Sequence, residues 1–270
     1  MTSSPRVALV TGASAGLGRA CADRLAAAGW VVVGASRRGT GGTGWAGLVM
    51  DVDSDGAVRD GVAGVLKEHG RIDAVVTAAG WGIAGAAEDT SIAEAKAQFE
   101  TNFWGSVRVV QAVLPSMRQR GTGRIVLLSS IGGVIGIPFQ AHYSATKFAL
   151  EGFAESLAYE VAPFGVAVTL VQPGNFATDF TASRKTAVAA TPDSAYGAAM
   201  AKAVSLMERD ERNGAPPSQV AAAVQRVLDA RRPPRRVSVG KASERIGIIA
   251  KRLLPFRVFE AGAKGSLGVE

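Results

Sequence analysis

Ser130, Tyr143 and Lys147 are the residues whose types and spacing could carry out chemistry. The tyrosine and the lysine are four positions apart, so on a helix they would face the same way, one turn from each other. A phenol normally titrates near pH ~10, but a neighbouring ammonium favours the phenolate and lowers the pKa of the phenol. A serine hydroxyl at an adjacent strand end can hold a carbonyl oxygen beside the phenol. The set predicts proton transfer at a carbonyl or alcohol oxygen while a hydride moves at carbon.

A glycine-rich turn near the N-terminus could bind the cofactor for such a reaction. Thr11-Gly12-Ala13-Ser14-Ala15-Gly16-Leu17-Gly18 follows an apolar run and opens a helical stretch. There Gly12 would allow the tight turn, Gly16 would give a pyrophosphate access to the backbone, and Gly18 would permit close packing of helix on strand. An ordinary strand–helix loop is the alternative. We expect a nucleotide site that includes Ser14 and Leu17.

The elements that must position these residues alternate along the chain. Short runs rich in Val, Ile, Leu or Ala predict strands at residues 6–11, 30–36, 47–50, 72–78, 124–130, 166–172 and 236–239. Helical patterns lie between them at 16–28, 54–69, 92–120 and 142–162, with two more near the C-terminus. Ser91 and Glu94 form a capping box before the long helix, and Pro115 should kink or tighten its end. Such alternation favours a parallel sheet covered on both faces.

Taken in order, these motifs resemble the short-chain dehydrogenase/reductase family, including its hydroxysteroid and retinol dehydrogenase-like members. The resemblance covers residues 6–240 and rests on the glycine turn, Asn102, Ser130, Tyr143-Ser144-Ala145-Thr146-Lys147, and Pro173-Gly174 followed by Thr178. It implies an α/β, single-domain, doubly wound Rossmann fold over residues 1–270, with a mainly parallel sheet of about seven strands. Ligands would then bind beyond the carboxyl ends of the strands.

The resemblance also implies roles for the motif residues. Tyr143 would donate a proton to the substrate oxygen, Ser130 would hydrogen-bond the same oxygen, and Lys147 would lower the tyrosine pKa and bind the nicotinamide ribose. Asn102 would hold a water that connects Lys147 to solvent. The nicotinamide would be lined by Pro173, Gly174, Phe176 and Thr178. Structural alternatives exist: Ser130 could only cap a strand, and Asn102 could be a satisfied polar group inside a helix.

Cofactor choice is expected to depend on the end of the second strand. Arg37 and Arg38 stand where an NAD-binding protein usually has an acid, and an arginine can bind a 2′-phosphate in a bidentate manner. NADP(H) is therefore favoured over NAD(H), although a solvated loop would look similar. Asp51 and Val52 resemble the pair that contacts adenine. The usual Asn-Asn-Ala-Gly is Thr77-Ala78-Ala79-Gly80 here, so Ala79 and Gly80 would contribute backbone contacts only, with weaker cofactor binding or local stability.

The predicted function is reduction of a ketone or aldehyde with NADPH, on a bulky and mainly apolar small-molecule substrate. Residues 179–217 would form a lid, and candidate pocket walls are Trp81, Ile135, Ile137, Phe139 and Phe180, each of which could instead be core packing. Two alternatives stay open. One is an NAD(P)-linked alcohol dehydrogenase working oxidatively, and the other is a non-catalytic NADP(H)-binding sensor. The helices at 92–120 and 142–162 are expected to pair in a homodimer or homotetramer.

Composition limits which other classes of protein the chain could belong to. Of the 270 residues 47% are apolar, which suits one large core, and the lone cysteine, Cys21, is expected to be a small buried group without a disulfide. No signal sequence or membrane-spanning run is seen, so a cytoplasmic protein is expected. No zinc-ligand spacing or nucleic-acid-binding motif accompanies the net charge of +7, and neither a metal nor a nucleic-acid partner is predicted.

The positive charge is concentrated near the C-terminus. Residues 231–257 contain nine basic residues and one acid, and the extension at 241–270 mixes basic with apolar side chains. We expect a helix packed on the domain or on its partner. Contact with an anionic membrane is an alternative, disfavoured because Pro255 interrupts the helix and Gly247 weakens it. Closure of the substrate lid is a third.

Overall fold

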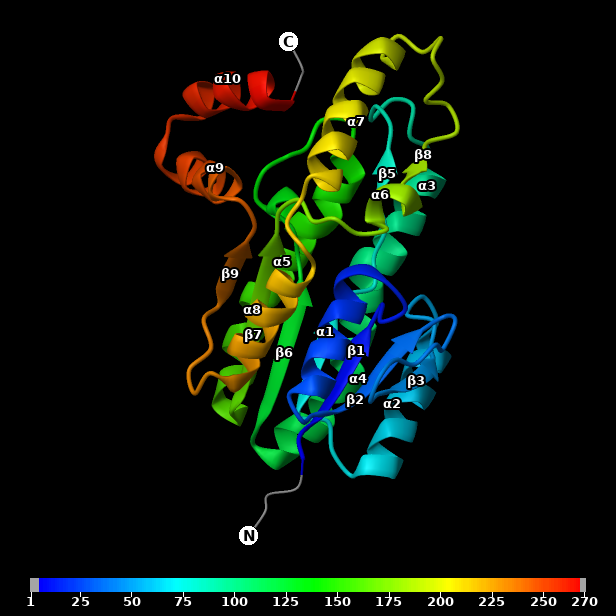
Figure 1. Cartoon of the computed structure of the whole chain (residues 1–270), viewed down its shortest axis with the longest axis vertical. Helices are drawn as coiled ribbons and strands as arrows, with labels where there is room; N and C mark the ends of the chain where they lie inside the picture. Colours follow the sequence, from blue (N-terminus) through cyan, green and yellow to red (C-terminus); the bar gives the residue numbers. More distant parts are fainter. Residues whose placement is uncertain (1–4, 268–270) are drawn as a thin grey trace.

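A seven-stranded parallel sheet forms the centre of the molecule (Figure 1). The computed structural model describes residues 5–267. In spatial order the strands are β3 (Ala46–Val49), β2 (Val31–Ser36), β1 (Val7–Thr11), β4 (Ala74–Thr77), β6 (Gly123–Leu128), β7 (Val166–Pro173) and β9 (Arg236–Val239). The chain moves outward in opposite directions from β1 and β4, which creates a crevice at their carboxyl ends. The predicted α/β fold is confirmed.

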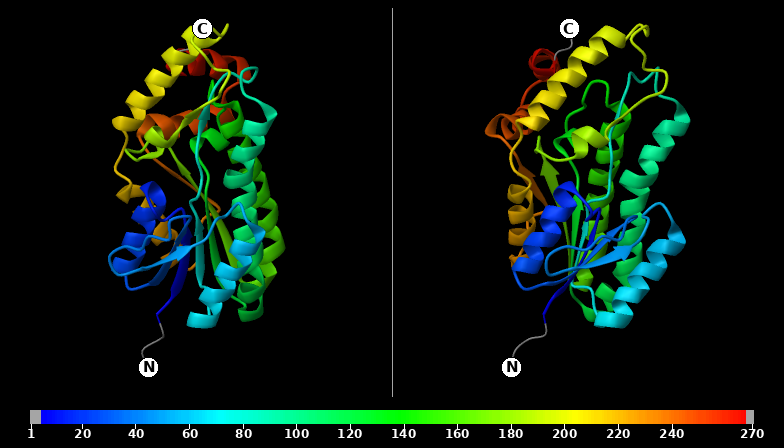
Figure 2. Two further views of the ribbon diagram at one scale, coloured as in Figure 1. Left: turned by 90° about the vertical axis from the view of Figure 1, so that its right-hand side faces the viewer. Right: turned by 45° about the vertical axis from the view of Figure 1, so that its right-hand side comes forward.

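Helices cover both faces of this sheet (Figure 2). One face carries α2 (Asp55–His69), α4 (Gly105–Arg120) and α5 (Ala141–Val161), and the other carries α1 (Gly16–Ala27) and α8 (Ser218–Asp229). Along β1, Leu9 packs into the first core while Ala8 and Val10 pack into the second. Both faces of each strand are therefore apolar, as expected for a parallel sheet buried on both sides. Cys21 is free and buried in the second core, as predicted.

The long helix expected at residues 92–120 is divided. It consists of α3 (Ile92–Phe99), a π-helical turn (Glu100–Trp104) and α4. The predicted capping box at Ser91 and Glu94 is confirmed. Pro115 lies inside α4, and the helix continues past it to Arg120. The irregular helical geometry lies instead at the π turn, which precedes α4. Such turns often occur at functional sites because they re-aim side chains within a helix.

A smaller set of elements lies beyond the carboxyl ends of the strands (Figures 1 and 2). β5 (Ile83–Ala84) pairs with β8 (Lys185–Thr186), and the predicted lid region also contains α6 (Phe180–Ser183) and α7 (Gly197–Arg212). After β9 the chain forms α9 (Ala242–Leu253), turns at Pro255, and continues as α10 (Phe256–Leu267). Within residues 5–267, no helix is both long enough and apolar enough to cross a bilayer.

The C-terminal helices differ from the packing expected of them. Ile248 of α9 is buried, but Ile246, Ile249, Leu253 and Phe256 are exposed. The predicted packing of a C-terminal helix on the domain is found along one face of α9, and the opposite face is exposed. The reason is that α9 contacts the domain along a single side, and the composition of the segment does not reveal which residues lie on that side.

Candidate active site

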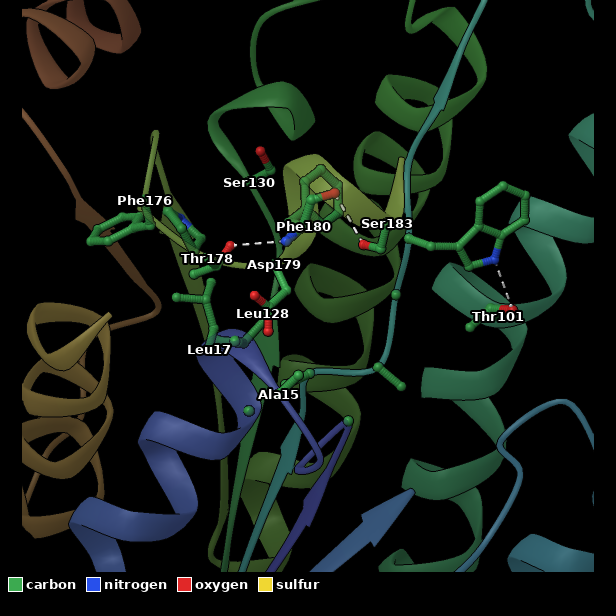
Figure 3. A pocket seen from close by; sticks show the side chains of 18 of the residues that line it. Ala15, Leu17, Thr101, Leu128, Ser130, Phe176, Thr178, Asp179, Phe180 and Ser183 are labelled. Atoms are coloured by element: carbon green, nitrogen blue, oxygen red, sulfur yellow. Dashed lines mark hydrogen bonds between the residues drawn. The ribbon is translucent and has the colours of Figure 1, made fainter. Parts of the chain in front are cut away.

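A large pocket runs across the carboxyl ends of the strands from β3 to β7, with a volume of about 830 Å³. Five strand spacings separate β3 from β7, so the pocket spans about 24 Å of the sheet edge. All of the cofactor residues predicted from the sequence line it: Gly12, Ser14, Gly16, Leu17, Gly18, Arg37, Arg38, Asp51, Val52, Ala79, Gly80, Tyr143, Lys147, Pro173, Gly174, Phe176 and Thr178. Figure 3 shows Ala15 and Leu17 of the glycine turn on one side, with Ser130 across the pocket.

The glycine turn is shaped to receive an anion. A Cβ on Gly12 would lie 2.7 Å from the backbone nitrogen of Ala79, and one on Gly18 would lie 2.4 Å from the carbonyl oxygen of Gly12. The turn therefore packs directly on backbone, where no side chain fits. Helix α1 begins at Gly16 with no side-chain cap and no acid in its first turn. Its first N–H groups remain available, which fits the pyrophosphate of a dinucleotide.

The β2 end of the pocket is basic. Arg37 and Arg38 are exposed there, and neither forms an ion pair or hydrogen bond with another residue in the range 5–267. The Ser36 hydroxyl accepts a hydrogen bond from the Gly39 backbone at 3.1 Å, which holds the turn that carries the two arginines. Their guanidinium groups are thus free to meet an anionic ligand.

Ser130, Tyr143 and Lys147 lie together at the β6 side of the pocket, and all three are buried. Ser130 begins a short 3₁₀ turn after β6, and its hydroxyl accepts a hydrogen bond from the Gly132 backbone at 3.0 Å. The Lys147 Nζ donates to the Leu128 carbonyl at 2.9 Å and lies 5.8 Å from the centre of the Tyr143 ring. One helix, α5, therefore carries both titratable groups, and the end of β6 anchors the lysine.

The ionisation of this cluster is controlled mainly by burial. Burial raises the pKa of the Tyr143 phenol, opposed by a hydrogen bond with the Ser130 hydroxyl. Burial also lowers the pKa of Lys147 to about 8, opposed by the negative charge of Glu151 one turn further along α5. The net shift of the tyrosine pKa is thus upward, because loss of hydration disfavours the phenolate more than its neighbours favour it, and the lowering expected from Lys147 is not found. Tyr143 is protonated at neutral pH and can act as a proton donor.

Asn102 lies in the π turn, fully buried behind the pocket wall. Its Oδ1 accepts from the Trp81 backbone nitrogen at 2.9 Å, and its Nδ2 donates to the Trp81 carbonyl at 3.0 Å and to the Thr146 hydroxyl at 3.3 Å. The Thr146 hydroxyl donates in turn to the Tyr143 carbonyl at 2.7 Å. Asn102 therefore connects the loop after β4 to the helix of the tyrosine, and its predicted water-binding role stays a prediction.

Three of the five predicted pocket walls line the pocket: Trp81, Ile137 and Phe180. The Phe180 ring lies 5.7 Å from the Tyr143 ring, so the lid helix α6 reaches the proton donor. Ile135 and Phe139 do not line it. Ile135 lies beside Gly247 of α9, and Phe139 adopts a left-handed backbone (φ 58°) while its carbonyl accepts from Gly85.

A buried ion pair joins the two helices of the predicted lid region. Arg184, after α6, pairs with Glu211 of α7, and its side chain is only 3% exposed. The Thr181 hydroxyl donates to the other oxygen of Glu211 at 2.6 Å. Glu211 lines the pocket, and its charge raises the pKa of Tyr143 while that of Arg184 lowers it. The lid therefore contributes opposed charges close to the proton donor.

Sequence reasoning missed several pocket residues: Asp53, Thr101, Gln140, Lys185 and Glu211 among them. The Thr101 hydroxyl accepts from the Trp81 indole at 3.2 Å (Figure 3) and donates to Asp53 at 2.9 Å. Because Thr101 is the neighbour of Asn102 in the sequence, its place in the pocket could have been predicted. Glu211 gave none, because 68 residues separate it from Tyr143 and only the fold of the lid brings them together.

Comparison with known proteins identifies the family of the chain. A family model described as short chain dehydrogenase matches residues 6–189. The chain belongs to the short-chain dehydrogenase family. This family comprises oxidoreductases that act on CH–OH or carbonyl groups with a nicotinamide cofactor, and the pocket residues described above fit such a cofactor.

Individual relatives of this short-chain dehydrogenase cover most of its length. A 3-ketodihydrosphingosine reductase of Bacteroides thetaiotaomicron is 40% identical over 252 residues, which is 93% of this chain and 94% of that protein. A retinol dehydrogenase 8 of Bos taurus is 38% identical over 67% of this chain and 62% of its own. The crystal structure of a short-chain dehydrogenase from Streptomyces avermitilis is 32% identical, with a TM-score of 0.85 over 98% of this chain and 100% of that one.

Proposed function

We propose that this short-chain dehydrogenase is an NADPH-dependent carbonyl reductase that acts on a bulky, mainly apolar substrate. One observation carries the proposal. A single pocket has a protonated, buried Tyr143 beside Ser130 at one end and the unpaired Arg37 and Arg38 at the other, with the glycine turn between them. A proton donor and an anion-binding turn on one sheet edge are the parts that reduction with a phosphorylated cofactor requires.

The residues of the chain would act as follows. Bound NADPH would supply the hydride to the carbonyl carbon. Ser130 would hydrogen-bond the carbonyl oxygen, and Tyr143 would transfer its phenolic proton to that oxygen as negative charge develops. Lys147, held by the Leu128 carbonyl, would bind the ribose hydroxyls and stabilise the phenolate left behind. Asn102 would keep the Trp81 loop and the Thr146 turn in register.

Preference for NADPH is supported by charge. Arg37 and Arg38 follow β2, where a carboxylate would bind the ribose of NAD, and no acid lies between them and Asp51. A guanidinium can form two parallel hydrogen bonds to a 2′-phosphate, whereas a carboxylate would repel it.

An apolar substrate is supported by the apolar side chains of Trp81, Ile137 and Phe180 that line the pocket, with the Phe180 ring beside the proton donor. Relatives named as a 3-ketodihydrosphingosine reductase and as retinol dehydrogenases are consistent with that preference. The first relative also favours reduction of a ketone.

The test is a panel of carbonyl compounds assayed through NADPH absorbance, covering aliphatic, aromatic and steroid ketones. We expect turnover of at least one bulky apolar ketone, with higher kcat/KM for NADPH than for NADH. Tyr143→Phe is the control for turnover at this site. NADPH binding without turnover of any carbonyl or alcohol would instead support a cofactor sensor.

Oxidation of an alcohol is the second candidate, because several relatives are named dehydrogenases. The raised pKa of Tyr143 disfavours it at neutral pH, since oxidation needs a proton acceptor and reduction needs a proton donor. Measuring both directions at pH 7 with the same alcohol and ketone pair decides between them. We also propose, as the sequence predicts, a cytoplasmic location and a homo-oligomer formed through residues 92–120, which comprise α3, the π turn and α4, and through α5.

A further inference from the structure

Exposed apolar side chains are concentrated in one short segment. Between residues 246 and 258, six large apolar side chains are at least 44% exposed: Ile246, Ile249, Leu253, Leu254, Phe256 and Val258. The other exposed large apolar residues within 5–267 are scattered over the rest of the chain. Single exposed apolar residues are ordinary, but a contiguous group of this kind marks a contact surface.

Helix α9 has two clearly different faces. Ile246, Ile249 and Leu253 follow the i, i+3, i+7 spacing that places side chains on one face, and this face is exposed. The opposite face carries Ile248, which is buried, and Lys251, whose ammonium donates to the Val134 carbonyl. The helix therefore packs on the domain with one side and presents an apolar stripe on the other.

Helix α10 carries further exposed apolar side chains. After the turn at Pro255, Phe256 is 69% exposed and Val258 is 57% exposed, although their spacing of two positions places them on different faces of α10. Figure 1 shows α9 and α10 at the periphery of the molecule, away from the sheet and next to the outer end of α7. The two helices thus form one outward layer at the same end of the molecule as the lid.

Three arginines accompany this stripe. Arg245, Arg252 and Arg257 are exposed, and within residues 5–267 none of their side chains forms an ion pair or hydrogen bond. On α9, Arg245 and Arg252 are seven positions apart and lie next to the apolar positions 246, 249 and 253. The acids nearby are already engaged: Glu244 accepts from the backbone nitrogen of Asn175, and Glu260 pairs with Lys264.

We propose that this C-terminal surface, made of the six apolar residues and the three arginines, docks onto an anionic lipid bilayer. An apolar stripe bordered by unpaired arginines matches an interface whose hydrocarbon lies beneath negatively charged headgroups. A second copy of the chain fits the surface less well. Two-fold pairing brings the same patch of both copies together, so the arginines would meet each other with no free acid to neutralise them.

The surface is connected directly to the active site. Glu244 of α9 binds the backbone nitrogens of Asn175 and Lys241 at 2.9 and 2.8 Å, and Asn175 lines the pocket. A Cβ on Gly174 would lie 2.1 Å from the Glu244 carboxylate, so the helix start sits against the loop after β7. A bilayer on this surface would lie close to the pocket, which suits a substrate that partitions into lipid. Only this link between the bilayer and the substrate rests on the proposed function.

The test is flotation of the full-length protein with vesicles of equimolar phosphatidylcholine and phosphatidylglycerol, compared with phosphatidylcholine alone. We expect binding to the anionic vesicles that weakens with salt. Ile249→Glu combined with Leu253→Glu should reduce that binding by at least about tenfold, and Arg252→Gln with Arg257→Gln by about fivefold per arginine. Ile92→Glu, at an exposed apolar position on α3, should leave it unchanged.

Equal vesicle binding by wild type and by the Ile249→Glu, Leu253→Glu variant would overturn the proposal, as would no binding to anionic vesicles. A change from dimer to monomer in light scattering on that substitution, without vesicle binding, would assign the surface to a second copy instead. Circular dichroism of each variant checks that the fold is intact. None of these measurements needs cofactor or turnover, so they stand apart from any failure to detect reductase activity.

Discussion

Two regions of the molecule are built in different ways: the inner wall of the pocket, and an outer wall formed by α9 and α10 that does not line the pocket. Ser130, Tyr143, Lys147 and Asn102 are all at most 9% exposed, whereas the apolar side chains of α9 and α10 are up to 76% exposed. The inner residues lie on a strand end and on helices whose other faces form the core. The outer elements are connected to the domain through a few polar contacts, chiefly those of Glu211 and Glu244. The predicted catalytic residues are therefore held by the core, whereas the cap, which consists of the predicted lid region and the C-terminal helices, is held by the contacts named above.

The cores explain why the inner wall is rigid. Leu150, Ala154 and Leu157 of α5 pack against the sheet, so the helix that carries Tyr143 and Lys147 cannot shift without opening the larger core. The cap has no comparable anchor. Its apolar residues Ile83, Ala187 and Ala190 form only a small separate cluster, and local opening there should be less costly than in the sheet.

The largest effect is expected from removing the proton donor of the inner wall. Tyr143→Phe keeps the ring, including its contact with Phe180, but removes the hydroxyl. Reduction should slow by about 10²–10⁴, the usual contribution of a general acid, while NADPH affinity changes little. Single-turnover kinetics and fluorescence titration measure the two quantities. Activity within tenfold of wild type would remove Tyr143 from the proposed role.

A smaller effect is expected at the basic end of the pocket. Arg37→Asp or Arg38→Asp should remove a charged hydrogen bond to phosphate, worth about 1.5–3 kcal/mol, or roughly ten- to hundredfold in NADPH affinity. NADH affinity should change little or improve. Arg59→Asp, an exposed charge reversal on α2, is the matched control. Equal NADPH and NADH efficiency in the wild type would show that the two arginines are surface charges only.

The pH dependence tests the coupling within α5. Lys147 has a pKa of about 8, so it loses its proton as pH rises through that value, and the rate of reduction should fall there. The negative charge of Glu151 raises the pKa of Lys147, so Glu151→Gln should move the fall to lower pH. The shift should be less than about one unit, because Glu151 is also paired with Arg236. A pH–rate profile unchanged by the substitution would contradict this coupling.

The smallest effect is expected from removing the contact between α9 and the loop after β7. Glu244→Ala removes the hydrogen bonds to Asn175 and Lys241, at a cost of about 1 kcal/mol because the carboxylate is only partly buried. Hydrogen exchange of α9 should accelerate about fivefold, with no change in β1 or β6. Exchange that rises equally in the sheet would show that core and cap unfold as one unit, which removes the distinction between the two walls.

The amino-acid sequence by itself determined the parts of this protein that depend on local rules. The glycine turn, the four-residue spacing of Tyr143 and Lys147, the capping box at Ser91 and the alternation of strands and helices each act over a few residues. For this reason they predicted the sheet and the gathering of the predicted catalytic residues at one edge of it. The family resemblance added roles for those residues, and the family itself is confirmed.

Only the tertiary structure decided the features that depend on distant neighbours. The π turn at Asn102, the pairing of Arg184 with Glu211, the raised pKa of Tyr143 and the exposure of the α9 stripe all follow from which elements pack together. Burial and desolvation depend on all the side chains that pack around a group. The sequence of a single segment therefore does not show which other elements will pack on it. The same isoleucine spacing suits a buried or an exposed helix face, and only the position of α9 on the domain separates Ile248 from Ile249.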